Sequence, residues 1–390
     1  MHVPPLQTMR RAHLDRALCC LFGTLVLAPW IDEFVRPDAI RGPTPEQRTA
    51  VELPKFGLDL ERLVTFPAQF ERHYADTFGL RDVLLGWRSL ERLTLFGVFP
   101  HRNVACGSAG WLFYTGESSV PLLRGLSPMT EDELERWSLE IEEHRRYCEA
   151  RGIAYLFAIG PNKETIYPEH LPEAWNKVGP TRLEQLYEHW RATGQRGVLD
   201  LRPALLSDKA RAGESEPTYY PLGTHWSDRG ALIACREIAA ALHASLPALV
   251  PRDLDLYELL RDAGPGESWA PAAYVPGWLT QHVVGYEPLG GRGARATRSV
   301  DQPYQRTWYE KRENPALSVL VFRDSFGEKP AKYLAESTSL VVSSSEYGID
   351  ETLIEAERPS AVIEIYVERK LLLAPPAIHR TAPIDALDKK

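Results

Sequence analysis

The sequence is poor in cysteine and has no metal-binding pattern. Only five of its 390 residues are cysteine, and none of them has the spacing of a metal site. Cys19 and Cys20 lie in an apolar N-terminal run, whereas Cys106, Cys148 and Cys235 are far apart. These positions exclude a disulfide framework. One bridge among the last three cannot be paired from sequence, and buried free thiols are the simpler interpretation.

An excess of positive charge and internal repeats are also absent. The chain has 45 Lys and Arg against 53 Asp and Glu, a formal net charge of -8. No global basic field therefore favours a nucleic-acid partner. The length and the 44% hydrophobic content are ample for one large domain or two smaller ones.

The first 36 residues predict a membrane anchor. Three arginines precede a charge-free stretch at 17–31, and Asp32 and Glu33 follow it, which is the pattern of an export signal whose N-terminus stays inside. A run this short can also be a buried core helix. A cut after Ala28 would leave Pro29 directly behind it, which is unfavourable. We therefore expect an uncleaved anchor in the inner membrane, rather than a cleaved signal peptide, and a periplasmic remainder.

Beyond a linker at 37–60, the chain predicts an α/β fold over 61–390. Predicted helices alternate with short apolar strands, which is typical of a mainly parallel sheet flanked by helices. A segment at about 251–304 is rich in Gly, Pro and aromatic residues and predicts a long excursion of the kind that often forms a lid or binding loop. The expected helices cover 66–78, 81–95, 130–151, 181–193, 228–242 and 350–357, and the expected strands cover 153–159, 198–201, 319–322, 340–342 and 361–367, with a hairpin at 103–114.

A strand, a sharp turn and a helix surround Ser325. In parallel sheets, reactive groups lie at the carboxyl ends of strands, and amides at a helix N-terminus can stabilise an oxyanion. Ser325 is therefore a candidate nucleophile. The competing interpretation is that Asp324 or Ser325 simply caps the helix. A nucleophilic serine also needs a base within hydrogen-bond reach, and the candidate is His225.

Polar residues follow a second buried strand, at 153–159. Asn162 and Lys163 stand at its expected carboxyl end, where they are candidates for contact with substrate or an oxyanion. A plain turn is the equally weighted alternative. Trp226 and Asp324 are further candidates for the same roles. No metal or soluble cofactor is implied by these residues.

Several sequence blocks follow one another in a defined order between about 60 and 372, and none of them is specific alone. These blocks are Phe66-Pro-Ala-Gln-Phe70, Asp76-Thr-Phe-Gly-Leu-Arg81, Leu95-Phe-Gly-Val98, Gly110-Trp-Leu-Phe-Tyr114, Pro161-Asn-Lys-Glu-Thr-Ile-Tyr-Pro168, Thr224-His-Trp226, Phe322-Arg-Asp-Ser-Phe326 and Ala361-Val-Ile-Glu-Ile-Tyr-Val-Glu-Arg369. In this ordered series the chain resembles the alginate O-acetyltransferase AlgJ/AlgX family, a group of SGNH-hydrolase-like proteins.

The resemblance implies a nucleophile at Ser325 and a base at His225. In the family, an aspartate two residues before this histidine orients it, but Gly223 stands there in this chain. Removing that acid from a Ser-His-Asp triad costs ~10⁴ in turnover in a well-studied protease. Asp228 or a backbone carbonyl could replace it.

Two functions are compatible with a chain that keeps Ser325 and His225 but has Gly223 in place of the acid. The first is an O-acetyltransferase or acetylesterase that acts on an exopolysaccharide (alginate, cellulose or another), with a membrane-bound acetyl-donor protein as partner and no nucleic acid. The alternative is a catalytically inactive member that binds polysaccharide or scaffolds a synthesis complex. The retained serine and histidine favour the enzyme, and Gly223 keeps the alternative open.

Overall fold

The computed structural model describes residues 6–35, 51–261, 263–291, 293–312, 314 and 316–380. By its internal contacts the chain divides into two compact units. Unit 1 contains Met1–His101 and Trp269–Leu279, and unit 2 contains Arg102–Ser268 and Thr280–Lys390. The expected domain from residue 61 is therefore divided, because residues 61–101 group with the N-terminal helix.

Unit 1 is built from helices. Helix α1 (Leu6–Val35) holds a 20-residue stretch, His13–Asp32, with a mean hydropathy of 1.5, which is long and apolar enough to cross a membrane. Signal sequences near an N-terminus share this property. Most of the predicted linker, residues 36–50, lies outside the described residues. Helices α2 (Leu60–Thr77) and α3 (Arg81–Phe96) confirm the two helices expected here.

Unit 2 has a central sheet with the strand order β4-β3-β12-β9-β10-β8-β7 among the described residues. The first five strands of that order pair in parallel, and β8 and β7 pair antiparallel at one edge. The sheet is thus mixed, although its centre is parallel as expected. The strands are β3 (Ala154–Gly160), β4 (Val198–Asp200), β7 (Arg295–Val300), β8 (Arg306–Glu310), β9 (Ser318–Arg323), β10 (Leu340–Ser344) and β12 (Ala361–Val367).

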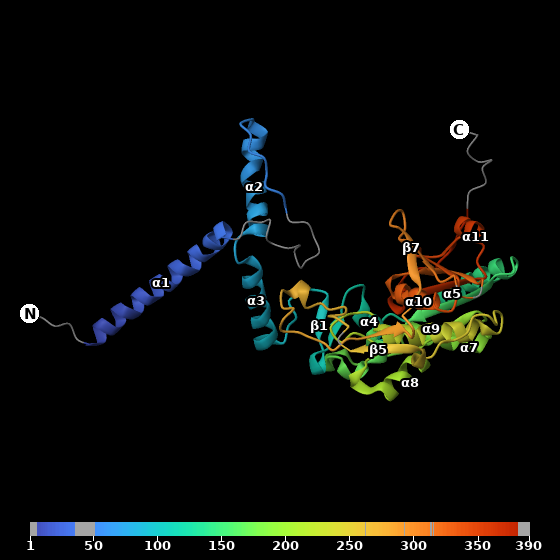
Figure 1. Cartoon of the computed structure of the whole chain (residues 1–390). Coiled ribbons are helices and arrows are strands. Elements are labelled where there is room, and N and C mark those ends of the chain that lie inside the picture. Colours follow the sequence, from blue (N-terminus) through green and yellow to red (C-terminus); the bar gives the residue numbers. More distant parts are fainter. Residues whose placement is uncertain are drawn as a thin grey trace, which may run out of the picture. The chain divides into compact units, whose positions relative to one another are not determined.

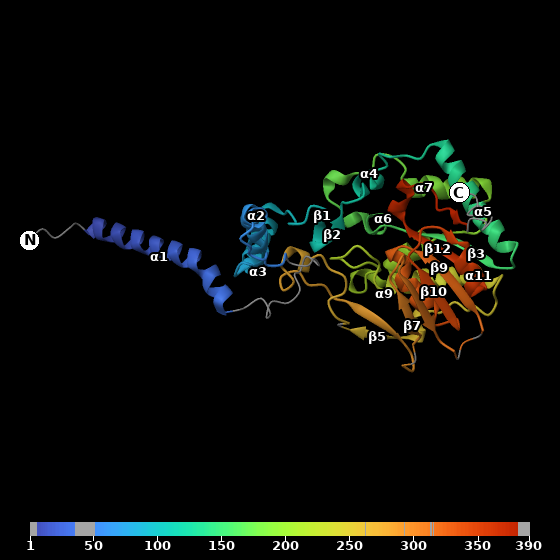
Figure 2. The same cartoon turned by 90° about the horizontal axis from the view of Figure 1, so that it is seen from above.

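Helices cover both faces of this sheet (Figures 1 and 2). Neighbouring residues on a strand point to opposite faces, so Ala158 belongs to one apolar cluster and Phe157 to the other. Burial on both faces explains why β3, β9 and β12 read as continuous apolar runs. Helices α8 (Arg202–Ala212), α9 (Asp228–His243) and α10 (Glu328–Leu334) pack on the first cluster, and α5 (Glu131–Glu149), α7 (Arg182–Thr193) and α11 (Glu351–Glu357) pack on the second.

Short elements surround the sheet. The predicted hairpin is confirmed, with β1 paired antiparallel to β2. The excursion at 251–304 contains an antiparallel pair, β5 and β6, and then supplies β7 to the main sheet. The bounds are β1 (Val104–Cys106), β2 (Leu112–Tyr114), α4 (Ser119–Leu123), α6 (Lys163–Ile166), β5 (Tyr257–Arg261), β6 (Val284–Pro288), β11 (Ile349–Asp350) and β13 (Ile378–His379).

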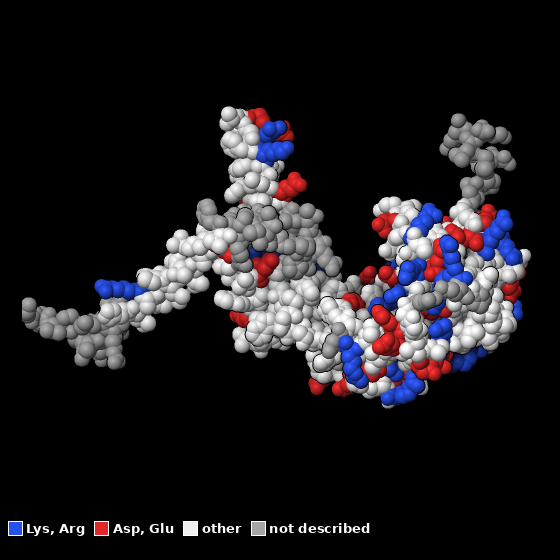
Figure 3. Space-filling model, in the orientation of Figure 1, with Lys and Arg blue, Asp and Glu red and all other residues white. Residues whose placement is uncertain are grey.

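The structure can be compared with two expectations from the composition, namely buried free thiols and the absence of a basic field. Cys148 and Cys235 are buried free thiols, and burial raises the pKa of each to about 12. On the face of unit 2 shown in Figure 3, Lys and Arg are interspersed with Asp and Glu. That face shows no field of one sign.

A buried polar network lies under the sheet face covered by α5. Glu364 on β12 is fully buried and accepts hydrogen bonds from the Tyr155 and Tyr366 hydroxyls, and His144 Nδ1 lies 2.5 Å from its Oε1. Burial lowers the pKa of His144, but the charge and hydrogen bond of Glu364 outweigh that effect, so the pKa lies above its ordinary 6.5. The raised pKa means that this ion pair stabilises the fold at low pH and loses its contribution as the pH rises through that pKa.

We expect Glu364→Gln to lower the free energy of unfolding by ~3 kcal/mol at about pH 6, because a buried charge loses its partner. The loss should be smaller at about pH 9, because the contribution of the pair declines as the pH rises through the raised pKa of His144. Urea unfolding at both pH values measures this, with exposed Glu355→Gln as the matched control. An equal loss at both pH values would contradict the role of His144.

Candidate active site

Ser325 lies in the turn that follows β9. The side chain of Asp324 accepts a hydrogen bond from the Phe326 amide (2.9 Å) through Oδ1 and from the Val367 amide (2.8 Å) through Oδ2. The capping role thus falls to Asp324, which ties the turn to the end of β12. Ser325 itself is exposed. Burial raises the pKa of Asp324, against the effect of those two amides.

His225 reaches this serine from a distant loop. Its Nε2 lies 2.8 Å from the Ser325 Oγ, which is hydrogen-bond distance for a nucleophile and its base. The loop is fixed on its far side by Trp226, which is 1% exposed and packs against Phe326 with 5.2 Å between ring centroids. Ser227 then caps α9, as the sequence predicted. Trp226 is therefore buried in the core, and the substrate contact predicted for it stays a prediction.

The other ring nitrogen of the histidine meets a carboxylate that the sequence did not suggest. Glu267 Oε2 lies 2.8 Å from His225 Nδ1. The same carboxylate accepts hydrogen bonds from the backbone amides of His225 (2.8 Å) and Thr224 (3.0 Å). Burial raises the pKa of Glu267, but these contacts with His225 and Thr224 outweigh it and hold the pKa below its ordinary value of 4.5. Ser325, His225 and Glu267 thus form a continuous chain of hydrogen bonds.

Both replacements suggested by the sequence for the missing acid are wrong. Asp228 starts α9 as expected, but its side chain pairs with Lys329. The Nδ1 of His225 faces a carboxylate instead of a backbone carbonyl. Glu267 stands 42 residues after His225 in the Gly- and Pro-rich excursion. No periodic pattern distinguishes Glu267 from the rest of that segment. The only signal in the sequence is that His225 needs an acid which position 223 does not supply.

Lys163 is a structural cation beneath this loop. It is 2% exposed, and its ammonium donates to the backbone carbonyls of Leu112, Tyr220, Pro221 and Gly223. Burial lowers its pKa to about 7, and nearby carboxylates oppose that shift. Its donors are directed at the backbone, and the contact with substrate predicted for Lys163 stays a prediction. Lys163 holds the loop that carries His225.

Two amides of the turn after β9, where helix amides were expected to stabilise an oxyanion, already have hydrogen-bond partners. The turn at 325–327 is a short 3₁₀ helix, and the amides of Phe326 and Gly327 donate to Asp324. Both carboxylate oxygens of Asp324 accept hydrogen bonds from backbone amides, and the substrate or oxyanion role predicted for Asp324 stays a prediction. Asn162 is 4% exposed, its amide donates to Glu368, and its Oδ1 has no partner among the described residues. Together with Thr224 and Arg369, Asn162 lines a narrow recess.

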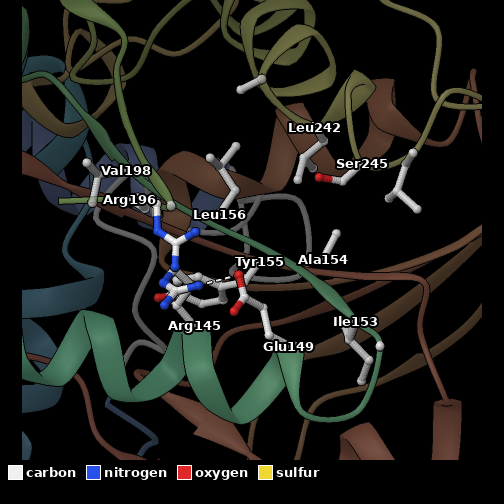
Figure 4. Close-up of a pocket in the computed structure, with 14 residues that line it drawn as sticks. Arg145, Glu149, Ile153, Ala154, Tyr155, Leu156, Arg196, Val198, Leu242 and Ser245 are labelled. Atoms are coloured by element: carbon white, nitrogen blue, oxygen red, sulfur yellow. Dashed lines mark ion pairs between the residues drawn. The ribbon is translucent and has the colours of Figure 1, made fainter. Parts of the chain in front are cut away.

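A larger pocket lies at the opposite edge of the sheet. It has a volume of about 460 Å³ and is lined by Ala154 at the start of β3, with Arg145 and Glu149 paired beside it (Figure 4). Gly160, at the active-site end of the same strand, is ~20 Å away at the usual rise per residue. This pocket is therefore separate from the chain of hydrogen bonds at Ser325.

Comparisons with known proteins bear on the family and the fold of this chain. Residues 104–267 match the family model of the SGNH hydrolase-like domain of the acetyltransferase AlgX. The resemblance to the AlgJ/AlgX family is confirmed. The matched segment includes His225 and Glu267 and ends before Ser325.

The curated relatives include a probable alginate O-acetylase AlgJ of Pseudomonas aeruginosa. It is 28% identical over 175 residues, which cover 44% of this chain and 41% of the relative. The chain thus matches about two fifths of that protein's length. The AlgJ of Pseudomonas syringae pv. tomato is similar, with 28% identity over 181 residues, covering 45% of this chain and 42% of the relative.

Among solved structures, Bacillus cereus PatB1 with a sulfonyl adduct has a TM-score of 0.51 and 13% identity, and the match covers 67% of this chain and 94% of PatB1. At that identity the likeness shows the fold, which is the SGNH-like α/β arrangement predicted from the sequence. The O-acetyltransferase domain of Pseudomonas putida AlgJ matches with a TM-score of 0.42 and 19% identity over 70% of this chain and 94% of that domain.

We expect Glu267→Gln to lower kcat for 4-nitrophenyl acetate by ~10³–10⁴, because the amide no longer stabilises the imidazolium. KM should change little, since Glu267 acts through His225. Glu258→Gln, an exposed carboxylate in the same excursion, serves as the control. Full activity of Glu267→Gln would show that the imidazole needs no carboxylate.

Proposed function

We propose that this chain is a serine O-acyltransferase that moves an acetyl group to a hydroxyl of an exopolysaccharide. The observation that carries the proposal is the sequence of contacts from Ser325 Oγ to His225 Nε2 and from His225 Nδ1 to Glu267, each 2.8 Å. An idle site has no physical need of a serine, a base and an orienting carboxylate in line.

In the proposed reaction, His225 takes the proton of Ser325 as the Oγ attacks the acetyl carbonyl of the donor. The C–O bond to the donor alcohol breaks, and that alcohol leaves with the proton from His225. An acceptor hydroxyl then attacks the acetyl-serine, gives its proton to His225, and leaves as the acetyl ester. Ser325 recovers its proton, so the cycle balances without a redox partner.

The oxyanion of each step needs donors. The amides of Phe326 and Gly327 are engaged by Asp324, so we assign this role to the backbone amide of Ser325 and the side-chain amide of Asn162. Asn162 belongs to the recess that also contains Thr224, the residue before the base. In this assignment the donor is the side-chain Nδ2 of Asn162, since its unpartnered Oδ1 can only accept a hydrogen bond.

The exposure of the site supports a polymeric acceptor. Ser325 is exposed, and the side chains of His225 and Glu267 are 28% and 32% exposed. A sugar hydroxyl on a long chain can reach such a site without entering a closed cavity. The alginate O-acetylases among the relatives support acetylation of a polysaccharide. We infer that the donor is a membrane-bound partner and that α1 anchors the chain facing the periplasm.

Ser325→Ala should lower acetyl release from 4-nitrophenyl acetate by ~10³ or more, since the nucleophile is lost. Intact mass spectrometry should show one acetyl group added to the native chain and none added to the variant. Ser299→Ala, an exposed serine in the edge strand β7, is the control. When mannuronate or glucan oligosaccharides are added, the acetyl group should be transferred to a sugar hydroxyl instead of to water.

Two outcomes would redirect the proposal. Release and labelling that persist in Ser325→Ala would remove the serine mechanism. Release that depends on Ser325 but never yields an acetylated sugar would make the chain an acetylesterase toward the acceptors tested. The contact between Glu267 and His225 supports the enzyme over the inactive binding or scaffold alternative.

A further inference from the structure

We propose that helix α2 lies in the interface between a membrane and water, with one apolar side in contact with lipid. The bilayer is the one that α1 is proposed to cross, so the inference rests on the anchoring part of the proposed function and not on the acyl transfer. Every residue that carries it belongs to unit 1.

Helix α2 has an apolar side that the rest of the chain leaves uncovered. No residue of α2, which the structure describes in full, is buried. Leu60 is 79% exposed, Val64 is 70% exposed, and Leu63 and Phe70 are each 42% exposed. Their spacing places these four residues on one side of a helix with 3.6 residues per turn. Continuous apolar surface of this kind marks a site that binds a protein or a membrane.

The segment before α2 extends this apolar surface. The Val51 amide donates to Asp76 Oδ2 (3.1 Å), and the Val51 carbonyl oxygen lies 2.6 Å from His73 Nδ1. Further along, the rings of Phe56 and Phe66 meet edge to face, with 5.3 Å between their centroids. The segment therefore runs beside α2. Three of its large apolar side chains are 62–84% exposed, namely Leu53, Phe56 and Leu58.

A row of aromatic rings connects α2 to the apolar helix α1. Phe66, Phe70 and Tyr74 follow one another along α2, with 5.9 and 6.2 Å between successive ring centroids. The Tyr74 ring lies 5.8 Å from the ring of Trp30, which stands near the end of the membrane-crossing stretch His13–Asp32. The apolar side of α2 is thus continuous with the end of that stretch.

A hydrogen bond fixes the other side of this junction. The Asp32 carboxylate accepts from the Leu80 amide (2.8 Å), three residues after the end of α2. In a chain anchored by α1, Trp30 and Asp32 lie where the helix leaves the hydrocarbon, a level that Trp and Tyr side chains favour. Tyr74 and Leu80 are held at the same level. These contacts identify lipid as the occupant of the apolar side of α2.

The opposite side of α2 is polar and carries charges of both signs. It contains Arg62, Gln69, Arg72 and Asp76. In Figure 3 the charged side chains over the upper part of α2 gather on one side, and the other side is white. The helix has two arginines against three acidic residues, so attraction to anionic lipid contributes little. Burial of apolar surface should supply the binding, and neutral phosphatidylcholine should therefore suffice.

Quenching of a fluorescent label by lipid tests this contact in the full chain. A bimane label is attached to one introduced cysteine in a chain that also carries Cys19→Ser, Cys20→Ser and Cys106→Ser, since the other two thiols are buried. Val64→Cys places the label on the apolar side, and Gln69→Cys on the polar side is the matched control. In phosphatidylcholine vesicles, lipid with a spin label near the headgroup should quench Val64→Cys ~5-fold or more above Gln69→Cys.

The depth of the quencher gives a second test. A spin label near the headgroup should quench Val64→Cys more than one at the end of the acyl chain, because an interfacial helix is buried only at the boundary of headgroups and acyl chains. Equal quenching at the two positions of α2, or stronger quenching by the deep label, would overturn the proposal. Absence of quenching at Val64→Cys would also overturn it. A disulfide-linked dimer of Val64→Cys in that case would assign the apolar side to a second copy of the chain.

The outcome can be separated from that of the proposed acyl transfer. Ser325 belongs to unit 2, so Val64→Cys should leave the release of acetyl from 4-nitrophenyl acetate unchanged. Quenching without turnover would support the interfacial helix and remove the reaction, whereas turnover without quenching would do the reverse. An intact mass that lacks α1 in the chain isolated from cells would remove the anchor, and this inference with it.

Discussion

A buried ammonium holds the candidate site together. Lys163 follows the central strand β3, and its donors gather the carbonyls of Tyr220, Pro221 and Gly223 beneath the loop that carries His225. Taking a charge out of water is costly unless such partners surround it. The loop is therefore held from below by Lys163 and from the side by Trp226. His225 has no regular element of its own to fix it.

The parallel centre of the sheet holds Ser325 in place, as Lys163 and Trp226 hold the loop of His225. β9 and β12 end side by side, and Asp324 joins their ends through the Phe326 and Val367 amides. The nucleophile thus stands on a rigid edge, and the base stands on a pinned loop. Glu267 comes from a third source, the excursion, so the three functional groups come from separate parts of the chain.

The sequence predicts the rigid parts of this arrangement well. The buried strands around Ser325 and the capped helices follow from apolar runs and cap residues, and His225 follows from the family resemblance. β7 and β8 were not predicted, because they lie at the sheet edge and lack continuous apolar runs. The sequence could not show that Lys163 and Trp226 are buried, because burial is a tertiary property. Glu267 could not be predicted, since its partner lies 42 residues away and no periodicity marks it.

The close approach between Gly223 and Glu267 also limits how such a site can evolve. A side chain at 223 and the present Glu267 conformation cannot coexist. A lineage that moves between an acid at 223 and the present acid at 267 by single substitutions must pass through an ancestor with a crowded site or with no carboxylate at all. A serine and a histidine without the carboxylate retain some acyl-transfer activity. An ancestor without the carboxylate would therefore be a slow enzyme and not an inactive one. A search that requires an acid at 223 would miss the carboxylate that Glu267 places beside His225.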